Sequence, residues 1–294
     1  MFLKRSAGLP GPWTEDRTLQ TVRFTNVFRE LDRTTLVFRQ LIRDPLRDDP
    51  WVVPATIIAR WFNRIETLEV MAPYLCEGPP PGHARLLRVL EERIREAIPK
   101  GPWVTGSYMV CSGHGRGMDK LSGMLRYSGL MLDWWEREGE AFFSGKLRPS
   151  LQAAHEELVK LDGLAGFTAY EVVTDLRWTS AVNPYDRMEW AHAGPGATRG
   201  GSRVLFKEPD LLSQESWKDQ EKLRRLMRKL LFMSRKEEYW PQDHPDWPAW
   251  ELREVEHTLC EFDKYERVRR EQGAAKRRYK WEGAEPLFPS GLDL

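Results

Sequence analysis

The chain has 294 residues, of which 41% are hydrophobic and 30% charged, and its formal net charge is +1. This composition is typical of a soluble globular protein with one large or two modest domains. The sequence has neither an apolar run long enough to span a bilayer nor a signal-peptide core, so we expect an intracellular protein without a membrane partner. Three widely spaced cysteines, Cys76, Cys111 and Cys260, form no zinc-binding pattern and fit a reducing compartment.

Hydrophobic spacing predicts a mainly α-helical fold. Apolar residues recur every three or four positions through most of the chain, and Pro and Gly separate the periodic stretches. We expect one catalytic unit over residues 1–294 with two helical lobes, at about 20–145 and 146–270, and an irregular tail at about 281–294. Residues 103–112 are the best candidate for a short extended segment. The expected helices cover 20–43, 54–75, 79–102, 118–140, 149–160, 166–178, 215–235 and 247–270.

The segment "LDGLAGFTAYEVVTDLRWT" (161–179) predicts two helices joined by a tight glycine turn. It fits the pattern L-x-G-[VIL]-x-x-x-[ST]-A, in which the glycine lets the backbone turn with no Cβ in the way. Backbone N–H groups at such a turn can hold a DNA phosphate. An ordinary helix end with a glycine cap is the alternative. The residues expected to contact DNA are Gly163, Gly166, Thr168 and Lys120.

The turn and the acidic residues after it resemble the helix–hairpin–helix of helical DNA glycosylases. In that superfamily an aspartate follows the hairpin after roughly two helical turns and a loop; Asp186 stands at nearly that separation, with Asp175 in between. The pattern is kept only in part, because Ala165 replaces the second hairpin glycine and the hairpin has no lysine. The resemblance implies a helical DNA glycosylase-like fold and argues against lyase chemistry.

Five segments give a second, narrower resemblance: "FTNVFRELDRTT" (24–35), "GRGMDK" (115–120), "TDLRWT" (174–179), "AGPGATRGG" (193–201) and "LCEFDKYER" (259–267). In this order they resemble the phage-associated α-glutamyl/putrescinyl thymine pyrophosphorylase family, described as amino acid:DNA transferases. The resemblance implies double-stranded DNA carrying 5-(pyrophosphomethyl)deoxyuridine as substrate and the host cytoplasm as location. It also implies that an amine displaces pyrophosphate; glycine, glutamate or putrescine serves in different members, and we favour glycine.

A pyrophosphate leaving group needs cationic and N–H donors around it. Glycines let backbone amides approach phosphate closely, and the planar guanidinium of arginine binds two phosphate oxygens at once. We therefore expect a pyrophosphate-binding loop; a plain loop whose glycines serve turns is the alternative. Its residues are Gly194, Gly196, Arg199 and Gly200.

A second candidate set for pyrophosphate lies in the first expected helix. Asn26, Arg29 and Arg33 are spaced so that they would share one helical face. An amide and two guanidiniums along one stripe suit a phosphate or a carboxylate. An exposed polar face with weak salt bridges is the alternative.

The amine must lose a proton to attack, so a carboxylate is expected in the site. Asp186 is the first candidate for this base because of its place after the hairpin, and Asp175 and Glu261 are the others. Asp175 could instead cap a helix or pair with Arg177. Glu261 could simply lie at the edge of a buried helix face.

The modified base must leave the DNA stack to react. Trp178, Tyr185 and Trp190 are candidates for stacking on it, with core packing as the alternative for each. The basic stretches at 222–236 and 264–280 would follow DNA phosphates, or form solvated helix faces.

The sequence does not match the phosphate-binding loop G-x-x-x-x-G-K-[ST], because the glycines of 107–120 are spaced differently and no Ser or Thr follows Lys120. This disfavours an ATP-dependent kinase. Displacing an activated leaving group requires no cofactor, although a divalent metal ion could bind the pyrophosphate. Two other functions stay open: a helix–hairpin–helix DNA glycosylase and a non-enzymatic DNA-binding protein.

Overall fold

The computed structural model describes residues 9–78, 83–105, 118–236, 250–275 and 278. The chain divides into two compact units: unit 1 comprises Met1–Asp32 and His192–Leu294, and unit 2 comprises Arg33–Ala191. Each unit is described by itself. The division differs from the lobe boundary expected near residue 145, because the helix at Arg17–Thr21 packs with the helix at Leu252–Arg269. The expected tail at 281–294 lies outside the described residues.

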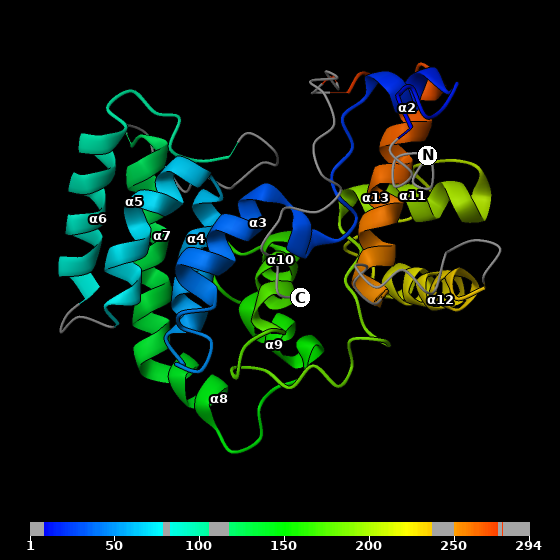
Figure 1. Ribbon diagram of the computed structural model, residues 1–294. Coiled ribbons are helices and arrows are strands. Elements are labelled where there is room, and N and C mark those ends of the chain that lie inside the picture. Colours follow the sequence, from blue (N-terminus) through cyan, green and yellow to red (C-terminus); the bar gives the residue numbers. More distant parts are fainter. Residues whose placement is uncertain (1–8, 79–82, 106–117, 237–249, 276–277, 279–294) are drawn as a thin grey trace. The chain divides into compact units, whose positions relative to one another are not determined.

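Both units are helical, which confirms the mainly α-helical fold (Figure 1). Unit 2 is built around α4, every residue of which is buried because its sequence is almost continuously apolar. α4 packs against α5, α7 and α10. The helices of unit 2 are α3 (Arg33–Phe38), α4 (Val52–Phe62), α5 (Ile65–Cys76), α6 (His83–Ala97), α7 (Lys120–Trp134), α8 (Glu140–Ser144), α9 (Leu151–Leu158) and α10 (Gly166–Leu176).

The helix expected at 54–75 is two helices. Asn63 adopts a left-handed conformation with φ 43°, which ends α4, and α5 begins two residues later. The Asn63 side chain accepts a 2.7 Å hydrogen bond from Nη1 of Arg60, which helps to hold this conformation. The helix expected at 118–140 is confirmed as α7, and a π-helical turn at Trp135–Gly139 leads from it into α8.

Unit 1 is built around α13, against which α2, α11 and α12 pack. Figure 1 shows α13 in orange, crossing α11 and lying beside α12. An isolated β-bridge joins Val22 to Arg278. In the described part of the chain, none of the helices is long and apolar enough to cross a membrane. The helices of unit 1 are α2 (Arg17–Thr21), α11 (Pro195–Phe206), α12 (Trp217–Ser234) and α13 (Leu252–Arg269).

The prediction of a single helix at 20–43 is wrong. α2 ends at Thr21, and the chain then continues without regular structure to a short 3-10 helix at Arg29–Leu31. The interruption has local causes: the N–H of Thr25 donates to Glu261 rather than to a helical carbonyl, and the Asn26 side chain accepts from the N–H of Phe28. Helical structure resumes in unit 2 with α3 and a π-helical turn at Arg39–Arg43.

Candidate functional site

The segment "AGPGATRGG" is helical from Pro195 onward and not the expected loop, and its binding of pyrophosphate stays a prediction. Gly194 is the N-cap of α11 and Pro195 its first residue, a position where a missing N–H costs nothing. A Cβ at Gly200 would overlap the carbonyl oxygen of Leu259 on α13. A Cβ at Gly196 would likewise overlap the side chain of Cys260. These glycines therefore let α11 and α13 approach each other closely.

Arg199 is engaged by carboxylates. Its Nε lies 3.3 Å from Oδ2 of Asp263, and its Nη1 pairs with Asp210. Arg203, one turn later, donates from Nε to Oδ1 of Asp263 at 2.8 Å. Asp263 on α13 thus binds both of these α11 arginines. An anion that bound Arg199 would have to compete with the carboxylates of Asp263 and Asp210.

A cluster of ionisable side chains surrounds the N-terminal half of α13, and all of them are buried except the half-buried His257. Glu256 accepts a 3.1 Å hydrogen bond from the N–H of Gly194, at the start of α11. The charges of Arg29 and Arg253 act on both Glu256 and its neighbour His257. Arg29 comes from the short 3-10 helix, so three separate segments of unit 1 meet here. We call Arg29, Arg253, Glu256 and His257 the α13 cluster.

The α13 cluster is largely shielded from water. Arg29 is 7% exposed, Arg253 5% and Glu256 6%. Nη1 of Arg253 lies 3.9 Å from Oε1 of Glu30 and 3.6 Å from Oε1 of Glu254, two contacts longer than a hydrogen bond. Two guanidiniums and the carboxylates of Glu30, Glu254 and Glu256 therefore lie together in a buried region, where charges interact strongly.

Burial changes the acidity of two members of the cluster. It raises the pKa of Glu256 to about 7, although the Gly194 N–H and the two guanidiniums act in the opposite direction. Burial lowers the pKa of His257 to about 3, and the charges of Arg253 and Arg29 add to this effect. At neutral pH His257 is therefore uncharged, whereas Glu256 can gain or lose a proton. A carboxylate with such a pKa beside two guanidiniums is a candidate for a functional site.

Glu261, one of the expected carboxylates, lies further along α13 and is tied to the beginning of the chain. Its Oε2 accepts a 2.9 Å hydrogen bond from the N–H of Thr25. Nζ of Lys264 lies 2.7 Å from Oε1 and 2.6 Å from Oε2. The same ammonium lies 5.6 Å from the ring centroid of Phe24. Both carboxylate oxygens of Glu261 are thus bound by donors, which gives this side chain a structural use.

Of the three residues expected to share a stripe, only Arg29 belongs to the α13 cluster. Asn26 is exposed and uses its side-chain oxygen to hold the turn at Phe28. Arg33 is exposed and begins α3 in unit 2. The stripe is not formed, because the helix that would align these residues is interrupted.

The glycine turn expected at 161–169 joins α9 and α10 in unit 2. Gly163 has φ 84°, a left-handed conformation that favours glycine, and its carbonyl accepts a 3.0 Å hydrogen bond from Nε1 of Trp61. The carbonyl oxygen of Gly166, the first residue of α10, lies 2.9 Å from Nε2 of His155. Thr168 is buried, whereas Lys120, at the start of α7, is exposed. DNA binding by this turn stays a prediction.

Asp186 caps α9. Its Oδ1 accepts from the N–H of Leu151 and its Oδ2 from the N–H of Gln152, both at 3.0 Å. These are N–H groups of the first turn, which has no acceptors within its own helix. Both carboxylate oxygens therefore have a structural use, in addition to the role as a base that the sequence suggests.

Asp175 forms a buried ion pair with Arg60. Its Oδ2 pairs with Nε of Arg60, and its Oδ1 accepts from Nη2 at 2.8 Å. Neither side chain is more than 2% exposed. This pair links α10 to α4 in the core of unit 2 and gives the Asp175 carboxylate a structural use; its role as a base stays a prediction.

The three candidate stacking residues differ in exposure. Tyr185 is 72% exposed and Trp178 45%, so both could meet a base. Trp190 is 6% exposed and packs against His155 and Tyr170, with ring centroids 5.2 and 5.7 Å away. Trp190 is a core residue, and a base could stack on it only if this packing opened.

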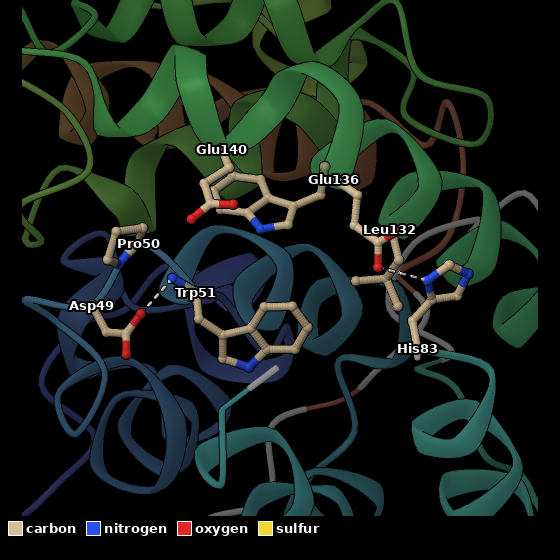
Figure 2. Close-up of a pocket in the computed structure, with 8 residues that line it drawn as sticks. Asp49, Pro50, Trp51, His83, Leu132, Glu136 and Glu140 are labelled. Carbon is tan, nitrogen blue, oxygen red and sulfur yellow. Dashed lines mark hydrogen bonds and ion pairs between the residues drawn. The ribbon is translucent and has the colours of Figure 1, made fainter. Parts of the chain in front are cut away.

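Unit 2 also contains a hollow lined by acidic and aromatic side chains. Figure 2 shows Glu136 and Glu140 above it and Trp51 and His83 below. Nδ1 of His83 lies 3.1 Å from Oε1 of Glu136. In the described residues, no group of three or more His, Cys, Asp or Glu side chains could hold a metal ion. The hollow has no residue in common with the expected site.

The sequence reasoning missed Arg253, Glu256 and His257. A signal for Glu256 exists, because Leu252, Val255 and Leu259 define the buried face of α13 and Glu256 falls on the same face. A charged residue on the apolar face of a helix needs a partner, and this one finds the N–H of Gly194.

Comparison with known proteins gives two matches. A family model described as the helical domain of 5-hmdU DNA kinase matches residues 1–275. The chain is also 27% identical over 208 residues to a 5-hmdU DNA kinase of Bacillus phage SP10, which covers 66% of this chain and 32% of that protein. The chain thus spans about a third of that relative's length. No solved structure matches.

Proposed function

The chain belongs to the family of the 5-hmdU DNA kinase helical domain, and from this premise we propose that it is a phage enzyme of thymine modification acting on double-stranded DNA. We further propose that it displaces pyrophosphate from 5-(pyrophosphomethyl)deoxyuridine with an amine, glycine in the first place. The α13 cluster is the observation that carries this proposal, because it combines two buried guanidiniums with a buried carboxylate.

In this reaction the amine nitrogen forms a bond to the exocyclic methylene carbon as the bond from that carbon to the pyrophosphate oxygen breaks. The leaving pyrophosphate takes the electron pair and gains negative charge. Arg29 and Arg253 would stabilise that charge, and their burial makes the interaction stronger than it would be in water. A divalent metal ion on the pyrophosphate would add to the same effect.

The attacking nitrogen also loses a proton, which Glu256 would accept. An ordinary carboxylate is a weak base at neutral pH, whereas a pKa of about 7 makes Glu256 a suitable acceptor. The neutral His257 beside it adds no positive charge that would oppose the approach of the proton. Glu261 is the second candidate for the base, although Lys264 and the N–H of Thr25 already bind it.

A second candidate function follows from the family match itself: the chain would bind DNA for a kinase reaction on 5-hmdU. The sequence does not match the nucleotide-binding loop G-x-x-x-x-G-K-[ST]. Nucleotide binding in that case would come from another polypeptide segment. This function needs the DNA-binding surface but not a carboxylate with a raised pKa.

One experiment separates these functions. The protein is incubated with DNA carrying 5-(pyrophosphomethyl)deoxyuridine and each amine in turn, with and without a chelator. The DNA is then digested to nucleosides, and their masses are measured by mass spectrometry. An aminomethyl-linked thymine supports the transferase, and release of free base supports the glycosylase. A parallel arm offers 5-hmdU DNA and ATP. Unchanged nucleosides in every arm would reject all the enzymatic functions.

Two arginine variants locate the reaction. Arg253→Lys keeps the positive charge but loses the planar pair of donors, so transfer should fall sharply. Arg199→Lys makes the same change on α11, where the side chain is bound by Asp263 and Asp210, and should leave transfer nearly unchanged. Equal losses in both variants would contradict the assignment of the reaction to the α13 cluster.

A further inference from the structure

We infer that the exposed face of α12 binds the phosphate backbone of duplex DNA, and this inference rests on the proposed action on DNA. Four basic residues occupy this face at intervals of three or four positions, and all are exposed. The exposed Phe232 continues the row at 71% exposure. We call Lys218, Lys222, Arg225 and Lys229 the α12 stripe.

The geometry of an α-helix makes the stripe straight. Residues three or four apart lie on the same side, so the four cations form one row about 16 Å long. Successive cations are about 4.5 to 6 Å apart along the axis, somewhat less than two base steps of duplex DNA, which are about 6.8 Å. A row of this kind can follow one phosphate strand without reading sequence.

The opposite face of α12 fixes the orientation of the stripe. Leu223 and Met227 are fully buried, Leu226 and Leu231 are largely buried, and α12 packs on α11 and α13. Gln220 is buried on the same side and its side chain bonds both the N–H and the carbonyl of Ala193. The helix cannot turn over to bury its cations, so the stripe faces outward.

Charge complementarity identifies the partner. Residues 217–236 contain eight basic and two acidic side chains, so a polyanion is the favoured partner. The two acids are close to the stripe: Lys222 lies 3.0 Å from Asp219, and Arg225 lies 3.3 Å from Glu221. Such exposed pairs are weak and can give way to phosphates.

The test uses unmodified duplex DNA, so its result does not depend on the proposed chemistry. Lys222→Gln, Arg225→Gln and Lys229→Gln are combined in one variant, and binding is measured between about 50 and 200 mM salt. The matched control combines Arg85→Gln, Arg88→Gln and Arg93→Gln, three exposed arginines of α6.

We expect the slope of log affinity against log salt to become shallower by about 2 to 3 in the stripe variant, and its affinity at low salt to fall about tenfold or more. The control should bind as the wild type does. Three results would each overturn the inference: no duplex binding by the wild type, a wild-type slope in the stripe variant, or the same loss in both variants. The last two would point to a protein partner or to non-specific charge, respectively.

Discussion

The N–H of Gly194 donates a 3.1 Å hydrogen bond to the carboxylate of Glu256, which joins the start of α11 to the buried face of α13. This contact satisfies one of the N–H groups at the helix start that have no partner within the helix. It also places the carboxylate where burial raises its pKa to about 7. One side chain therefore serves the fold and is available for proton transfer.

Glu256→Gln separates these two uses. The amide oxygen can still accept from Gly194, but the side chain can no longer take up a proton. We expect amine transfer to fall by about 10²- to 10⁴-fold, the usual contribution of a general base, with no loss of melting temperature. Single-turnover product formation and thermal unfolding, measured together, check this. Transfer at the wild-type rate would remove Glu256 from the mechanism.

The same residue should make stability depend on pH. Its pKa is higher in the folded protein, about 7, than the ordinary value of 4.5, so the folded state binds the proton more tightly. The stabilisation of the folded state by this tighter proton binding is fully present below about pH 4.5 and is lost as the pH rises through 7. Between these limits the free energy of unfolding of the wild type should fall by about 3 kcal/mol relative to Glu256→Gln. Denaturant unfolding of both proteins across this range measures it; a constant difference would contradict the raised pKa.

Gly200→Ala should loosen the contact between α11 and α13. The new methyl group would overlap the carbonyl oxygen of Leu259, and a backbone atom cannot move aside as a flexible side chain can. We expect a loss of about 1 to 3 kcal/mol in unfolding free energy, despite the higher helix propensity of alanine. Gly129→Ala in α7 is the control, because the nearest atom there is the side-chain Cδ1 of Leu87 at 3.3 Å. Equal stability of the two variants would argue against the close approach.

The pair of Arg60 and Asp175 should matter for stability rather than for chemistry. Asp175→Asn removes the carboxylate that balances a buried guanidinium, and we expect a loss of about 3 to 5 kcal/mol. Replacing both partners, as Arg60→Met with Asp175→Leu, removes the buried charge altogether and should cost clearly less. Urea denaturation of the single and double variants decides this. A double variant as unstable as the single one would show that packing, not charge, is lost.

The helices were predictable where one face of each is consistently apolar. α6, α9, α10, α12 and α13 fall within stretches whose period is evident in the sequence. The segment 20–43 misled this reasoning, because its apolar spacing is helical but its polar groups bond to distant partners such as Glu261. Local periodicity contains no information about such contacts.

The α13 cluster was predictable only in part. Arg29 stood among the candidates, but its partners come from helices far away in the sequence, and only folding brings Gly194, Arg253 and Glu256 together. The glycines of α11 led to the opposite error, because a phosphate-binding loop was expected where two helices pack closely. The sequence shows that a position needs the absence of a Cβ, but not whether a phosphate or a neighbouring helix approaches it.

The cap that Asp186 provides to α9 closes a ring of chain from Leu151 to Asp186 that includes the whole of α10. A contact of His155 with the carbonyl of Gly166 lies across the middle of this ring. Fraying at either end would therefore disturb the other, so the amide protons of α9 and α10 should exchange with solvent in one cooperative step. The glycine turn at residue 163 thus moves as part of a closed segment rather than as a mobile loop.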